Sequence, residues 1–299
     1  MMKVVTHSGD FHADEVLAVA TLSLFYGREN LLIIRSRDPE VIAAADSAVD
    51  VGYVYDPARL RFDHHQEGGA GTHENGIPYS SFGLVWKEYG ERLSGSVEAA
   101  RVIEEKVAYP IDAADNAIEV FTQVRSDAFP YLFHNMVSAL RPTWKESFEG
   151  IRTFDQGFFE ALSIAEHILR REITIAAHLQ EGLSHISAAY ETSPDRRILL
   201  IDGDYPVDSV AHKYPEVLFV VKPDKQNTDI WKVRTVRENL HSFMNRKDLP
   251  AAWAGKTYDA LREITGVTDA VYCHTKRFIA TARSKEGALE LAHIATEHP

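Results

Sequence analysis

The chain has 299 residues, of which 45% are hydrophobic and 25% are charged, a balance typical of a globular protein rather than a disordered one. It contains no apolar run of about 18 residues, which excludes a membrane-spanning helix, and its single cysteine, Cys273, excludes an internal disulfide and a zinc site built from cysteines. The formal net charge is -12, which argues against a long, sequence-independent grip on nucleic acid, because such a grip needs a broad basic stripe.

The acidity belongs to the first part of the chain. Residues 1–190 carry 16 Lys and Arg against 28 Asp and Glu, whereas residues 191–299 carry 16 of each kind. An acidic first part suits a cation-binding site, and a neutral second part can accept anionic ligands. Met1 leads directly into a strand pattern, without a secretory leader or a transit segment, so we expect a cytoplasmic protein.

The first 125 residues alternate short apolar strands with helices. The strand-like segments are nearly continuous in their apolar residues, which is typical of a parallel sheet covered by helices on both faces. A glycine-rich loop at 67–76 leads into further helical segments. We expect strands at 3–6, 31–37, 48–56 and 60–66, and helices at 14–27, 38–46, 80–90, 96–109 and 111–125.

The second part begins with one long helix or a helical pair at 154–190, whose place between two α/β patterns makes it a connector, and a hinge is expected at 193–197. We expect strands at 198–204, 217–224, 230–236, 270–275 and 277–283, and a closing helix at 285–298. The predicted architecture is α/β, with a mostly parallel N-terminal domain at 1–150, a helical connector at 151–192 and a smaller C-terminal α/β domain at 193–299.

Residues that can bind metal ions gather where the predicted strands of the first part end. In open α/β sheets, ligands bind at the carboxyl ends of the strands. A single Asp or His at such a place is usually satisfied by its neighbours, so the prediction rests on four clusters at equivalent positions. The clusters are His7 to Asp14 after the first strand, Asp50 with Asp56 on the third, Asp63–His64–His65 ending the fourth, and Asp112 with Asp115 one helical turn apart.

The types of ligand predict the chemistry of this site. Imidazole and carboxylate without thiolate suit manganese, zinc, iron or cobalt. Five or six ligands are too many for one closed structural zinc, which takes four, and they fit two ions about 3.5–4 Å apart that share a bridging aspartate and water. Such a pair activates water for in-line attack on phosphorus, and its positive charge would balance the crowded acids of the stretch THSGDFHADE.

The motif DHH at the end of a strand, after a His/Asp loop and a mid-sheet Asp, resembles the DHH phosphoesterase superfamily. More closely, HSGDFHADE, RSRD, VDVGYVYDP, FDHHQ, YSSFGLVWKEYG and IDAADN resemble the Myg family of metal-dependent hydrolases, whose eukaryotic members are described as 3'–5' RNA exonucleases. The likeness continues through NRKDLPAAWAG and GVTDAVYCHTKRFIATARSKEGALELA, so it covers nearly the whole chain.

The resemblance implies a role for each cluster. The usual opening His-x3-Asp-x-Asp of the superfamily is His-x4-His-x-Asp here, as in the Myg family, so a histidine replaces one carboxylate. Two divalent ions are implied, with Mn²⁺ favoured and Mg²⁺, Zn²⁺ or Co²⁺ as alternatives. The implied metal ligands are His7, His12, Asp14, Asp50, His64 and, for the fourth motif, Asp115 in preference to Asp112. The implied catalytic residues are His64, His65, which faces the phosphate, and Asp63, which orients this pair.

The second domain is implied to bind the part of the substrate that does not react. Family members commonly have a glycine pair after Phe-Ile, where this chain has Ala280 and Thr281, so its substrate preference can differ. The candidates to face the substrate together with His65 are Arg246, Lys247, His274, Lys276 and Arg283. For each of these five, a solvated surface charge is the alternative.

Four further charged residues have plainer interpretations. Asp10 and Glu15 are interpreted as acids of the first helical turn, where the helix dipole favours them. Arg35 and Arg37 alternate along a strand, so only one of them faces a given side. Either one is a phosphate clamp or a partner of Asp38.

The sequence predicts metal-assisted hydrolysis of a phosphoester, and the resemblance favours a 3'–5' exonuclease acting on short single-stranded RNA or oligonucleotides. A phosphatase or phosphodiesterase acting on a dinucleotide, a cyclic dinucleotide or pyrophosphate is the second hypothesis, which the acidic charge keeps open. A catalytically inactive, metal-binding regulatory protein and an amide-cleaving metallohydrolase are hypotheses of other classes. No membrane partner is expected, and a homodimer is left open.

Overall fold

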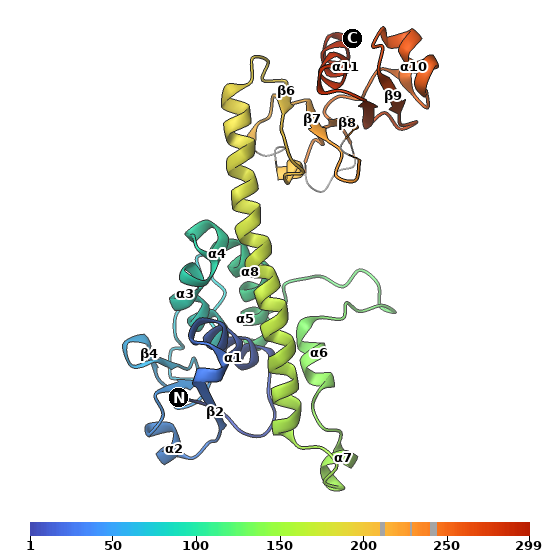
Figure 1. The fold of residues 1–299 in the computed structure, drawn as a ribbon. Helices are drawn as coiled ribbons and strands as arrows, with labels where there is room; N and C mark the ends of the chain where they lie inside the picture. Colours follow the sequence, from blue (N-terminus) through green and yellow to red (C-terminus); the bar gives the residue numbers. More distant parts are fainter. Residues whose placement is uncertain (210–212, 228, 240–243) are drawn as a thin grey trace. The chain divides into compact units, whose positions relative to one another are not determined.

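The computed structural model describes residues 1–209, 213–227, 229–239 and 244–299 (Figure 1). The chain divides into two compact units, residues 1–177 and 178–299, and each contains a five-stranded sheet with helices. The α/β class predicted from the sequence is therefore confirmed. Among the described residues, no helix is long and apolar enough to cross a membrane.

The sheet of the first unit is mostly parallel. β1 (Met2–Thr6) pairs in parallel with both β2 (Leu31–Arg35) and β3 (Ser47–Val49). β5 (Arg61–Phe62) runs parallel to β3, and β4 (Tyr55–Asp56) lies at the edge, antiparallel to β5. Because the strand order is β2-β1-β3-β5-β4, the carboxyl ends of β1, β3 and β5 lie next to one another.

The single strand predicted at 48–56 is two strands in the structure. Between β3 and β4 the backbone turns at Asp50 and Tyr53, whose φ angles are 56° and 57° in the left-handed region, and Gly52 has a φ of 99°. Left-handed angles cannot continue a strand, so the chain folds back and leaves Asp50 at the carboxyl end of β3. Hydropathy does not reveal this turn, because the residues around it are as apolar as a strand.

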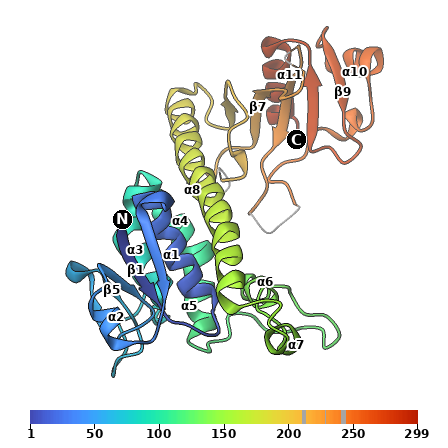
Figure 2. The ribbon, with the colours of Figure 1, turned by 60° about the horizontal axis from the view of Figure 1, so that its bottom comes forward.

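Helices cover both faces of this sheet (Figure 2). Side chains alternate between the two faces along a strand, and adjacent residues of β1 show this directly. Val4 belongs to the main core, which includes residues of α1 (Ala13–Tyr26) and α3 (Ser81–Ser94). Val5 belongs to a smaller cluster on the other face, which includes residues of α2 (Pro39–Ala43).

Five further α-helices and one π-helical stretch lie between α3 and the first strand of the second unit. They are α4 (Val97–Ile103), a π-helical stretch (Glu104–Ala108), α5 (Tyr109–Asp115), α6 (Phe133–Ala139), α7 (Trp144–Phe148) and α8 (Phe154–Thr192). Single turns of 3-10 helix lie at Arg28–Asn30, Pro57–Arg59, Val207–Ser209 and Ala251–Trp253.

The helix predicted at 111–125 ends at Asp115 instead. Ala117 has a φ of 55°, which no α-helical residue adopts. The side chain of Asn116 donates a hydrogen bond of 2.8 Å to the carbonyl of Asp112 and so caps the last turn. The early end leaves Asp115 at the C-terminus of α5.

The second unit has a five-stranded sheet with helices. In chain order, its described strands and helices are β6 (Ile198–Leu200), β7 (Phe219–Pro223), β8 (Trp231–Thr235), α10 (Tyr258–Thr265), β9 (Ala270–Cys273), β10 (Ile279–Ala282) and α11 (Lys285–Glu297). The strand order is β6-β7-β8-β10-β9, in which β6 and β7 are parallel and the other neighbours antiparallel. Leu291 and Ala295 of α11 are fully buried in the core of this unit, together with residues of the sheet.

Candidate metal centre

A cleft with a volume of about 1330 Å³ opens in the first unit, at the carboxyl ends of three neighbouring strands. His7 follows β1, Asp50 follows β3, and the run from Asp63 to His65 follows β5. Parallel strands in the order β1-β3-β5 place all of these residues at one edge of the sheet, where ligands of α/β proteins bind.

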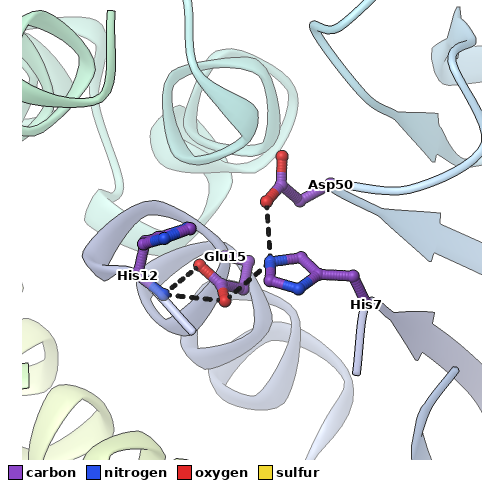
Figure 3. Close-up of side chains that lie close together, drawn as sticks. All are labelled: His7, His12, Glu15 and Asp50. Carbon is purple, nitrogen blue, oxygen red and sulfur yellow. Dashed lines mark hydrogen bonds and ion pairs between the residues drawn. The ribbon is translucent and has the colours of Figure 1, made fainter. Parts of the chain in front are cut away.

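His7 connects two carboxylates of the cleft (Figure 3). Its Nε2 lies 3.0 Å from Oε1 of Glu15 and 3.2 Å from Oδ2 of Asp50. Burial lowers the pKa of His7, but the hydrogen bonds to Asp50 and Glu15 outweigh it and raise the pKa to about 9. A buried imidazole with two anionic neighbours is therefore a strong local base.

Asp50 is the carboxylate that contacts the histidines from both neighbouring strand ends. Its Oδ1 lies 3.5 Å from Nε2 of His64 and accepts a hydrogen bond of 3.0 Å from the hydroxyl of Ser81. Burial raises the pKa of Asp50, but the hydrogen bonds from His64 and His7 outweigh this effect and hold the pKa well below its ordinary value. Asp50 therefore stays ionised between two histidines.

Asp14 is buried among like charges. It is 1% exposed, and within the described part of the chain neither of its carboxylate oxygens has a hydrogen-bond partner. Burial raises the pKa of Asp14 well above its ordinary value, and the charges of Asp50 and Asp115 raise it further. A buried carboxylate without partners is costly, and a cation is the group that would relieve that cost.

His64 lies on the other side of Asp50. Its Nε2 is 3.1 Å from Oδ2 of Asp115, the last residue of α5. Burial lowers the pKa of His64, but the neighbouring carboxylates of Asp115 and Asp50 outweigh it and raise the pKa to about 10. The early end of α5 thus gives the cleft a carboxylate that contacts the DHH motif.

Among the residues that the structure describes, three overlapping groups could each hold a metal ion. Within each group, one ligand atom from every residue lies within 4.8 Å of the others. The groups are His7, His12, Glu15 and Asp50; Asp50, His64 and His65; and His12, Asp14 and Asp115. Because the groups share Asp50 and His12, they form one continuous set of imidazole and carboxylate ligands, which fits divalent transition metals.

Asp112 does not join these groups. It is fully buried, and its carboxylate accepts hydrogen bonds from the hydroxyl of Ser80 (2.5 Å) and the backbone N–H of Gly83 (3.1 Å). Its other oxygen lies 2.6 Å from Nε2 of His73, whose Nδ1 lies 2.9 Å from Glu104. The carboxylate is therefore directed into the packing between α5 and α3 rather than into the cleft.

Asp63 orients His65 and belongs to none of the three groups of possible metal ligands. Its Oδ1 lies 2.8 Å from Nδ1 of His65, and its Oδ2 accepts a 2.6 Å hydrogen bond from the backbone N–H of Tyr53. Burial raises the pKa of Asp63, but the hydrogen bonds from His65 and Tyr53 outweigh it and lower the pKa. The ring of His65 is 53% exposed, so its orientation is fixed while it remains open to a ligand.

Two of the candidates in the second unit are held by backbone carbonyls. Arg246 donates to the carbonyls of Tyr214 (2.7 Å) and Val217 (3.0 Å). Lys247 donates to the carbonyls of Thr296 (2.8 Å) and His298 (2.6 Å), at the C-terminal end of α11.

The other three candidates are more open. Lys276 and Arg283 are exposed. His274 is half-buried, and its ring centroid lies 4.4 Å from that of Phe278.

Among the described residues, four arginines line the cleft, Arg37, Arg59, Arg61 and Arg141, and only Arg37 was a candidate from the sequence. Arg37 lines it and lies 3.1 Å from Nδ1 of His7, whereas Arg35 is buried and pairs with Asp155. Arg141 lines the cleft from beyond α6 and donates to the carbonyl of Phe11. The alternation of Arg35 and Arg37 indicated that one of them would face the site, but the choice depends on the packing of α8 against β2.

Comparison with known proteins identifies the family. The model of a family described as MYG1_exonuc, an uncharacterised protein family (UPF0160), matches residues 3–296. The chain belongs to this family. The resemblance to the Myg family inferred from the motifs is thereby confirmed.

The curated relatives align over nearly the whole chain. The MYG1 protein of Dictyostelium discoideum is 32% identical over 317 residues, which cover 97% of this chain and 95% of the relative. The MYG1 protein of Schizosaccharomyces pombe is 30% identical over 320 residues, which cover 100% and 98%. The human protein named MYG1 exonuclease is 29% identical over 325 residues, which cover 97% and 84%.

The packing of Asp112 can be tested by Gly83→Ala. A Cβ at residue 83 would lie 1.9 Å from Oδ2 of Asp112, so the carboxylate and α5 must shift. We expect the free energy of unfolding to fall by about 1–3 kcal/mol, measured by urea denaturation. Glu91→Ala, at an exposed position of the same helix, is the matched control, with an expected change within about 0.5 kcal/mol. Equal stability of the two variants would mean that Asp112 is not packed against α3.

Proposed function

We propose that the chain is a metal-dependent phosphoesterase that hydrolyses phosphodiester bonds and removes nucleotides from the 3' end of short single-stranded RNA or oligonucleotides. The observation that carries the proposal is Asp14, a buried carboxylate without a partner among the described residues, beside the His and Asp side chains of three strand ends. Relatives named MYG1 exonuclease support the reaction class. The 3' direction and the preference for RNA follow from the family resemblance.

Within this proposal, the residues fall into two metal positions. His7, His12 and Asp50 would hold one ion, at the first position. Asp50, His64, Asp115 and Asp14 would hold the other, since His64 lies beside Asp50 and Asp115 and Asp14 lies beside Asp115. Manganese is the proposed metal, since imidazole with carboxylate suits it. Divalent ions bound there would lower the pKa of a water molecule and offset negative charge on the phosphoryl oxygens. Asp112 is not part of this ligand set, since its carboxylate already has three partners.

His65 is the proposed contact to the phosphoryl group. The hydrogen bond to Asp63 engages Nδ1 and leaves Nε2 free of that contact. This bond also raises the pKa of His65, against the effect of burial. A protonated His65 would donate Nε2–H to a phosphoryl oxygen, and Asp63 would fix the ring in the orientation that this requires.

The first unit also supplies cationic groups for further phosphates. Arg37 and Arg141 both line the cleft, and a guanidinium matches the geometry of phosphate oxygens. The cleft volume of about 1330 Å³ exceeds the roughly 300–1,000 Å³ of common small-molecule pockets, which favours a substrate longer than one nucleotide. We propose further that residues 1–150 form a catalytic domain like that of the DHH phosphoesterases, and that residues 193–299 bind the rest of the substrate.

A small phosphate compound is the second candidate substrate. The excess of acidic residues before residue 190, 28 against 16 basic ones, opposes long polyanions and favours a dinucleotide, a cyclic dinucleotide or pyrophosphate. A regulatory protein without catalysis is disfavoured, because a site that performs no chemistry gains nothing from a costly buried carboxylate such as Asp14.

The reaction is tested with metal-stripped protein, Mn²⁺ and 5'-labelled RNA from dimer to 20-mer, with pyrophosphate and a cyclic dinucleotide as parallel substrates. We expect stepwise shortening of the RNA. Asp50→Asn and His64→Ala should each lower kcat/KM by at least about 100-fold, since even residues that only support metal ligands cost 10- to 100-fold. Glu91→Gln, on the exposed side of α3, is the control. Turnover of only pyrophosphate or the cyclic dinucleotide would support a small phosphate compound as the substrate instead. Wild-type activity in both variants would refute the metal centre.

Metal binding is tested separately through stability. Adding Mn²⁺ to the stripped protein should raise Tm, because an ion that binds only the folded state stabilises it. In Asp14→Asn, the metal-free protein should melt higher than the metal-free wild type, because a buried unpartnered charge is removed, and the gain from Mn²⁺ should shrink. Differential scanning fluorimetry measures both values. A metal-free Asp14→Asn that melts well below the wild type would show that Asp14 is stabilised by the protein alone.

A further inference from the structure

We infer that Glu15 is a fourth ligand of the first metal position, together with His7, His12 and Asp50. This inference rests on the proposed metal centre and adds a residue that the sequence analysis interpreted as an acid of the first helical turn. Figure 3 shows the carboxylate of Glu15 between His12 and His7, on the side of the cluster where α1 begins.

The burial of Glu15 argues against a purely helical role. An acid that stabilises a helix N-terminus typically does so at the surface. Glu15 is 0% exposed and lies near Asp14 and Asp50, which are also buried. By contrast, Asp10, in the loop just before the helix, is exposed. A third buried negative charge in one cluster requires more positive charge than the dipole of one helix supplies.

The geometry suits a shared ion. Ligand atoms about 2.0–2.2 Å from one metal ion lie roughly 3–3.5 Å from one another. Nε2 of His7 is 3.0 Å from Oε1 of Glu15 and 3.2 Å from Oδ2 of Asp50. One ligand atom from each of the four residues, His12 included, lies within 4.8 Å of the others.

Glu15 has a second contact that must be separated from metal binding. Both of its carboxylate oxygens lie 2.8 Å from the backbone N–H of His12, which forms one half of a capping box at the start of α1. Each oxygen has two lone pairs, so this hydrogen bond leaves capacity for a further partner. A glutamine at this position closes a capping box as well as a glutamate does, and this allows the two roles to be distinguished.

The inference also accounts for the balance of charge at the first position. Without Glu15, the first position would have two imidazoles and the single carboxylate of Asp50. Glu15, in the first turn of α1, supplies a second negative charge. Two imidazoles and two carboxylates would then neutralise one divalent ion.

The experiment is titration of Mn²⁺ into metal-stripped wild type and E15Q by isothermal calorimetry, with far-UV circular dichroism and Tm of the metal-free proteins. We expect E15Q to keep its helix content, because the cap is retained, and to bind Mn²⁺ at the first position at least about 10-fold more weakly. D10N, which changes the exposed acid in the loop just before α1, should bind Mn²⁺ as the wild type does. E15D, which keeps the charge on a shorter side chain, should bind more tightly than E15Q and serves as the test if E15Q folds poorly.

The outcomes separate this inference from the proposed function. Unchanged Mn²⁺ affinity in E15Q would overturn the role of Glu15 while leaving the metal centre intact. Failure of the wild type to bind Mn²⁺ would overturn both. Normal Mn²⁺ binding that depends on Glu15, without hydrolysis of any phosphate substrate, would support this inference and refute the proposed reaction.

Discussion

Electrostatic repulsion between buried carboxylates is the constraint on which the first unit depends. Asp14, Glu15 and Asp50 are each at most 5% exposed and lie around one point at the edge of the sheet. Two like charges 4 Å apart repel by about 4 kcal/mol at the effective dielectric of a partly buried site. His7 and His64 offset this repulsion for Asp50, which they hold ionised, but neither oxygen of Asp14 has a partner in the described chain. The protein alone therefore leaves the cluster incompletely neutralised, which is what the proposed metal centre would require.

The fold holds these groups together through contacts that lie outside the cluster. The left-handed turn at Asp50 ends β3 early, and Ser81 of α3 binds the carboxylate that the turn exposes. The network of Asp112 ties α5 to α3 through Ser80 and Gly83, and so fixes the helix from which Asp115 reaches His64. The two acids of α5 therefore have different roles, because Asp112 anchors the helix and Asp115 faces the cleft.

Part of this arrangement could be predicted from the sequence. Strand ends are visible as changes from apolar to polar residues, so the gathering of His7, Asp50 and His64 followed from the parallel order of the strands. Which of two nearby acids lies against His7 and Asp50 could not be derived, since the exposure of Asp10 and the burial of Glu15 depend on how α1 packs against the sheet.

Backbone conformation limited the prediction in a different way. The turn at Asp50 and the early end of α5 depend on left-handed residues, Asp50, Tyr53 and Ala117. Gly52 lies in the first of these turns, but the three residues themselves are not glycines, the residue type that normally signals such a conformation. A hydropathy pattern therefore extends both elements past their real ends.

The distribution of cationic side chains bears on where substrate specificity arises. In the second unit, Arg246 and Lys247 are committed to backbone carbonyls, and their charge stabilises the unit itself. In the first unit, Arg37, Arg59, Arg61 and Arg141 line the cleft that contains the ligand cluster, and of these Arg61 and Arg141 also donate to backbone carbonyls. If phosphates are recognised mainly by these arginines and by His65, binding energy is concentrated close to the bond that is cut rather than along an extended groove. Such a distribution fits short substrates, and it allows an acidic protein to bind a polyanion without a broad basic surface.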